Sequence, residues 1–191
     1  MKTQTKRMST KTLALGAMLS ALVVVLQMVA KVSSAFLPVT ISLSLIPIVI
    51  GAATCHYGMG AWLGLVSAMV ILLSGSAEPF FSFSPAATVL VVLAKAIASG
   101  LVSGLIYKWL SKKNSTIAIF TASIACPIIN TGIFLLGCYL FFMELITSLA
   151  GGQDVAAFVI TALIGWNFVF EFGTSLIFSP TIKKIIDIKN K

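Results

Sequence analysis

The chain alternates between long apolar stretches and short polar connections. Six apolar stretches occupy residues of about 12–30, 39–56, 59–74, 86–107, 116–143 and 156–182. Each is near the ~20 residues that a helix needs to cross a bilayer. A backbone in hydrocarbon must satisfy its own hydrogen bonds, so continuous apolar runs of this length predict helices. The pattern predicts an all-α integral membrane protein in which residues 1–191 form a single domain of six transmembrane helices.

The composition supports a lipid-facing surface. Hydrophobic residues make up 59% of the chain and charged residues only 9%, whereas a soluble domain has roughly 25% charged residues. The first apolar run, from Leu13 to Ala30, follows a basic stretch as a signal peptide would. It is longer than a typical signal-peptide core and ends without a clear cleavage site. We therefore expect a retained first helix.

Positive charges gather at alternate ends of the apolar stretches. Eleven of the thirteen basic residues lie at ends that six antiparallel crossings would bring to one side of the membrane. They are Lys2, Lys6, Arg7, Lys11, Lys108, Lys112, Lys113, Lys183, Lys184, Lys189 and Lys191. Short loops rich in lysine and arginine stay in the cytoplasm, which predicts a multi-pass cell-membrane protein with both termini cytoplasmic. Because the charges flank membrane segments, nucleic acid is not an expected partner.

Two charges and two amides inside the predicted spans are candidate ligand-binding groups. They are the charged Lys95 and Glu171, and the amides Asn130 and Asn167, the latter beside Trp166. With ~1.5 Å of rise per residue, Lys95 lies about 14 Å, Asn167 about 16 Å and Asn130 about 18 Å below the outer surface. Glu171 is one turn deeper than Asn167 on the same face. Three helices thus place polar groups at a common depth.

Two interpretations of this polar level are open, and they are compatible. Lys95 and Glu171 could form a structural ion pair, with Asn130 and Asn167 as hydrogen-bonding links between helices. Alternatively, Lys95 binds an anionic group of a ligand while the amides fix its orientation, and Glu171 holds Lys95 in place.

The predicted outer loop between the third and fourth spans is rich in phenylalanine. Its sequence, residues 78–85, includes Glu78, Phe81 and Phe83. Such a loop can anchor the protein at the membrane interface or cover an apolar ring of a ligand. We include all three residues among the candidate substrate-binding residues.

Signs of catalysis and of metal binding are absent from the sequence. It contains one histidine, no CxxC among its three cysteines and no pairing of a nucleophile with a base. We therefore predict a protein that is not an enzyme and has no metal or cofactor. A Walker A sequence is also absent, so energy for active transport would come from a partner.

Small residues form a stripe on the first predicted helix, at Ala14, Ala17 and Ala21. Small residues four apart let another helix approach closely in lipid. The stretch from Ala14 to Ala21, together with the chain length, the six spans and the charge bias, resembles the substrate-binding S components of energy-coupling factor (ECF) vitamin transporters. Residues 45–52 and 57–61 also resemble the second and third helices of that family. The resemblance covers essentially the whole chain.

The resemblance implies a function and a set of partners. Members of that family bind a vitamin between their last three helices and the outer loops. An Ala-x-x-x-Ala motif, matched here by Ala17 and Ala21, docks on a transmembrane coupling subunit that works with two ATPase subunits. The expected substrate is therefore a small vitamin-like solute, such as pantothenate, biotin or riboflavin. A membrane-embedded enzyme acting on a lipid or small solute, a non-catalytic assembly protein and a stand-alone carrier are the alternatives.

Overall fold

The computed structural model describes residues 10–36 and 43–189, without the side chains of residues 33–36, 162–164, 166–167 and 187–189. The described residues form helices joined by short connections. In chain order, the helices are α1 (Thr10–Phe36), α2 (Leu45–Thr54), α3 (Tyr57–Leu73), α4 (Glu78–Phe83), α5 (Pro85–Leu110), α6 (Ser115–Phe141), α7 (Met143–Ala150), α8 (Val155–Phe158), the π-helix η1 (Val159–Gly165) and α9 (Trp166–Lys189).

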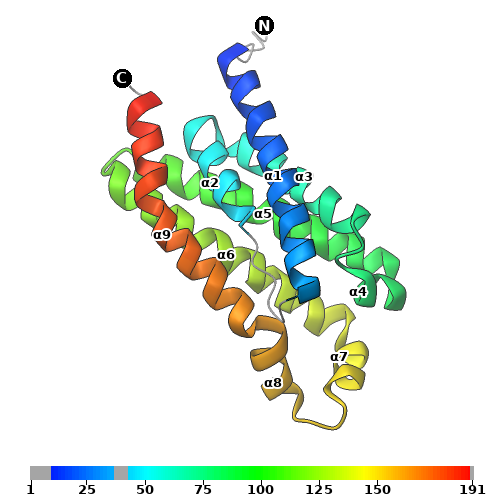
Figure 1. Ribbon diagram of the computed structural model, residues 1–191. Coiled ribbons are helices and arrows are strands. Elements are labelled where there is room, and N and C mark those ends of the chain that lie inside the picture. The colour runs from blue at the N-terminus through cyan, green and yellow to red at the C-terminus, as the bar shows by residue number, and fades with distance from the viewer. Residues whose placement is uncertain (1–9, 37–42, 190–191) are drawn as a thin grey trace, which may run out of the picture.

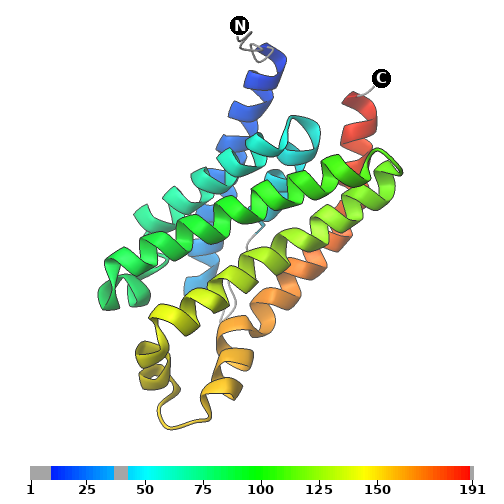
Figure 2. The ribbon, with the colours of Figure 1, turned by 180° about the vertical axis from the view of Figure 1, so that it is seen from behind.

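The long helices lie side by side in a bundle. Helix α1 begins, and α9 ends, at the same end of the molecule, whereas α7 and α8 lie at the opposite end (Figure 1). Seen from behind, α5 runs between α3 and α6, with α9 beyond α6 (Figure 2). We call the end with α7 and α8 the loop end and the other the terminal end.

The helices match the predicted apolar stretches in position but not all in length. Among the described residues, three helices are long and apolar enough to cross a bilayer, namely α1, α5 and α6. A fourth is added if α7 and the segment Val155–Thr161, bent by 92°, count as one crossing. Helix α2 has only ten residues and α3 seventeen. The all-helical membrane class is therefore supported, and the count of six crossings stays a prediction.

Side chains mark where several helices start. Asn114 accepts hydrogen bonds from the backbone N–H groups of Thr116 and Ile117, at 2.9 and 3.2 Å, and so caps α6. His56, the only histidine, caps α3 by accepting from Gly58 N–H at 3.1 Å. Such caps satisfy N–H groups that have no partner within the helix. The histidine thus has a local structural role at the start of a helix.

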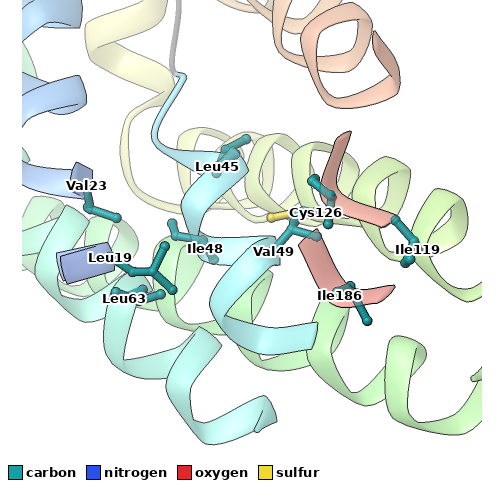
Figure 3. Close-up of a cluster of buried hydrophobic side chains, with 10 residues drawn as sticks. Leu19, Val23, Leu45, Ile48, Val49, Leu63, Ile119, Cys126 and Ile186 are labelled. Carbon is teal, nitrogen blue, oxygen red and sulfur yellow. The ribbon is translucent and has the colours of Figure 1, made fainter. Parts of the chain in front are cut away.

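The short helix α2 lies at the centre of the largest apolar cluster (Figure 3). Its Leu45, Ile48 and Val49 pack among residues from four other helices. The partners shown in Figure 3 are Leu19 and Val23 of α1, Leu63 of α3, Ile119 and Cys126 of α6, and Ile186 of α9. This cluster joins both ends of the chain to its middle.

Helices α3 and α5 cross with their backbones in contact. A Cβ atom added to Gly60 would collide with the Gly100 carbonyl oxygen, and one added to Gly64 would collide with the Ala96 carbonyl oxygen. These small residues are therefore used inside the chain's own bundle. Without a hydrophobic drive between helices in lipid, such close van der Waals packing is a main source of association.

We expect Gly64→Ala to destabilise the bundle, because the new methyl group meets backbone that cannot rotate away. Overpacking of this kind costs about 1–3 kcal/mol. Thermal unfolding of the purified protein in detergent measures the loss. Gly132→Ala on α6 is the matched control, since a Cβ there meets nothing within 4 Å. Equal unfolding temperatures for the two variants would contradict the packing interpretation.

Candidate functional site

A cavity of about 330 Å³ lies inside the bundle, at the low end of the ~300–1,000 Å³ common for ligand sites. Its polar lining comes from five helices and from the connections before α2 and α4: Gln27, Ser44, Ser67, Ser76, Thr88, Lys95, Asn130, Thr131 and Glu171. Gln27 lies late in α1, Thr88 early in α5 and Asn130 in the second half of α6. These positions place the cavity in the half of the bundle nearer the loop end.

Lys95 and Glu171 bring opposite charges to this cavity. The Lys95 Nζ atom lies 4.9 Å from the centre of the Phe134 ring, within the distance at which a cation is attracted to an aromatic face. Glu171 is only 6% exposed, and its charge attracts that of Lys95. The Phe134 ring and the Glu171 carboxylate line the same cavity as Lys95.

The structure brings three of the predicted polar residues together. Lys95 of α5, Asn130 of α6 and Glu171 of α9 all line this one cavity. The side chains of Trp166 and Asn167, also expected here, lie outside the described residues.

The aromatic wall of the cavity differs from the one expected. Phe80 lines it, with ring centres 5.5 Å from Phe134 and 5.1 Å from Phe142 in edge-on arrangements. Phe81 and Phe83 are 39% and 43% exposed and do not belong to the lining found among the described residues.

The geometry of α4 explains this difference. Neighbouring residues of a helix point about 100° apart, so burying Phe80 against α6 turns Phe81 outward. Glu78, the first residue of α4, is exposed and likewise lies outside the described lining.

A hydrogen-bonded group in the cavity wall was not expected. The side-chain oxygen of Gln27 accepts from Ser44 Oγ at 2.8 Å and from Ser67 Oγ at 3.4 Å. The group joins α1, the start of α2 and α3. The available signal was an isolated amide inside the apolar run of the first helix, a position where polar side chains are costly.

The alanine stripe of α1 faces away from the bundle. Ala14, Ala17 and Ala21 are exposed, whereas Leu19 and Val23 of the same helix are buried. The described part of the chain leaves this stripe uncovered, unlike the glycines between α3 and α5.

An apolar helical bundle around a charged and hydrogen-bonding cavity is typical of membrane proteins that hold a small polar solute. The family model described as "ECF transporter, substrate-specific component" matches residues 11–182. The chain therefore belongs to this family, as the sequence resemblance indicated. No curated protein and no solved structure matched. The family is one of substrate-specific transporter components rather than enzymes, and it supports a membrane location.

Proposed function

We propose that this chain is the substrate-capturing subunit of an ECF-type importer and that the cavity around Lys95 binds a small, vitamin-like anion from outside the cell. The family match supports the role. The observation that carries the choice of site is that Lys95 and Glu171 line one cavity with two amides and several hydroxyl groups. A soluble anion would exchange water for these groups, while Phe80 and Phe134 contact its apolar part.

The orientation of the chain follows from its charges. Lys11 lies at the start of α1, and Lys183 lies in the last part of α9. Lys108 lies at the end of α5, and Lys112 lies in the connection that follows. The start of α1 and the end of α9 mark the terminal end (Figure 1). By the positive-inside rule this end is cytoplasmic, so the cavity lies in the outer half of the membrane.

Six crossings are compatible with the two short helices. Helix α3, with seventeen residues, is at the lower limit of ~17–25 for a span. Helix α2 is surrounded by α1, α3, α5, α6 and α9. The helix therefore borders protein on several sides, and a short helix is tolerated at membrane depth where protein rather than lipid surrounds it.

Lys95 supplies the charge expected to select an anionic group. A carboxylate or phosphate would form a charge-assisted hydrogen bond with its ammonium group, an interaction worth about 1.5–3 kcal/mol. Pantothenate and biotin are examples of vitamins with a carboxylate. Glu171 would then keep the ammonium group in place and accept a hydrogen bond from the solute.

We expect Lys95→Met to reduce solute binding by about tenfold to a hundredfold, because it removes the cation and keeps a long apolar side chain. Mass spectrometry of small molecules that co-purify with the full chain identifies the solute and its amount. Lys113→Met, which removes an exposed lysine outside the cavity, is the control. Unchanged solute recovery from Lys95→Met would refute the assigned site.

The exposed alanine stripe of α1 is the proposed docking face for the coupling subunit, which works with two ATPase subunits. Ala14, Ala17 and Ala21 would let a partner helix approach the α1 backbone closely. A stand-alone carrier would need no such face. A substitution in the stripe therefore distinguishes a subunit that docks on a coupling subunit from a stand-alone carrier.

We expect Ala17→Trp to abolish co-purification with a coupling subunit and to leave solute binding intact, since the indole projects from the outer face of α1. The control is Leu136→Trp, a similar enlargement at an exposed position of α6. Full complex formation by Ala17→Trp would exclude the stripe as the docking face.

A further inference from the structure

Gln27 is a buried polar residue of α1 that reaches the cavity. It is 7% exposed and belongs to the cavity lining, as do both of its partners, Ser44 and Ser67. Each serine hydroxyl donates to the same Gln27 oxygen. An amide oxygen has two lone pairs, so both acceptor positions of the Gln27 oxygen are occupied.

The other end of the Gln27 amide is a pair of N–H donors. Within residues 10–36 and 43–189, no hydrogen bond is made by this nitrogen. The only fully enclosed side-chain polar atom without a partner in those ranges is Ser123 Oγ. The Gln27 nitrogen therefore keeps accessible surface, and the open space that Gln27 borders is the cavity.

We infer that the Gln27 amide donates a hydrogen bond to an uncharged acceptor of the bound solute. This inference rests on the proposed function and adds a second recognition point to Lys95. The two serines fix the amide oxygen and thereby direct the donors, so little rotamer freedom is lost when the solute binds. The substrate class is then a small organic anion with a carbonyl, ureido or hydroxyl oxygen separate from its charged group.

The position of Gln27 on α1 gives this bond a second consequence. Gln27 follows Val23 by four residues on the buried face of α1, while Ala17 and Ala21 lie on the exposed face. Helix α1 packs mainly on α2 and α3, whereas Lys95 belongs to α5. A solute held by both Gln27 and Lys95 therefore links α1 to α5 across the cavity. Occupancy of the cavity restrains the helix that carries the alanine stripe.

The test compares probes with and without the second acceptor. Pantothenate and biotin each carry a carboxylate and an uncharged oxygen acceptor, whereas hexanoate carries only the carboxylate. Affinities are measured by thermal shift on the detergent-purified full chain. We expect Gln27→Met to weaken pantothenate or biotin by about tenfold and to change hexanoate little. A purely structural role for Gln27 would weaken all the probes by the same factor, and that result would overturn the inference.

A second variant keeps the test decisive if Gln27→Met does not fold. Gln27→Glu retains an acceptor for Ser44 and Ser67 but removes both donors. Its added charge repels each anionic probe, so the difference between probes still isolates the lost donor. We expect the same loss of discrimination against hexanoate. Discrimination equal to that of the wild-type chain would overturn the inference.

The remaining outcomes separate this inference from the proposed function. If the wild-type chain co-purifies with a Lys95-dependent solute that has no uncharged acceptor, the inference about Gln27 fails and the transport role stands. If the wild-type chain binds no solute at all, both fail. Hydrogen exchange tests the link between helices: pantothenate or biotin should slow exchange in α1 of the wild-type chain but not of Gln27→Met. Equal protection in both would refute the link.

Discussion

The contact of the α3 and α5 backbones is the constraint on which the cavity depends. Gly64 lies against the Ala96 carbonyl group, and Lys95 is the residue before Ala96. The crossing therefore fixes the depth and direction of the only lysine in the cavity lining found among the described residues. A larger residue at position 64 would push α5 away from α3 and shift the ammonium group relative to Phe134 and Glu171. The small residues Gly64 and Ala96 thus set the position of the Lys95 charge through the packing of α3 on α5.

In the proposed function, the two faces of α1 have different tasks, solute binding on the buried face and docking on the exposed face. Leu19 and Val23 of α1 pack in the apolar core. Gln27 lies on the same buried face and lines the cavity. The alanine stripe on the opposite face stays open to a partner helix. Because both faces belong to one helix, a solute bound to Gln27 as proposed would also restrain the position of the stripe. A solute can favour one position of α1 only if it binds that position more tightly than another. The hydrogen bond to Gln27 can supply this difference in affinity.

Much of this arrangement could be predicted from sequence, because membrane depth is nearly one-dimensional. Counting residues from the ends of apolar runs placed Lys95 and Asn130 at one level, and both line the same cavity. Rotation about a helix axis is harder to predict. The choice of Phe80 over Phe81 depends on how α4 packs against Phe134 and Phe142 of α6 and its end. Gln27 was missed because its partners, Ser44 and Ser67, are distant in sequence and meet only in the folded bundle.

The short helix α2 borders the polar cavity. Ten residues extend about 15 Å, half of the ~30 Å hydrocarbon core, and the helix is enclosed by its neighbours. Its first residues, Leu45 and Ile48, border the cavity, and Ser44 at its start bonds to Gln27. Helix α2 therefore contributes both to the apolar core and to the wall of the cavity.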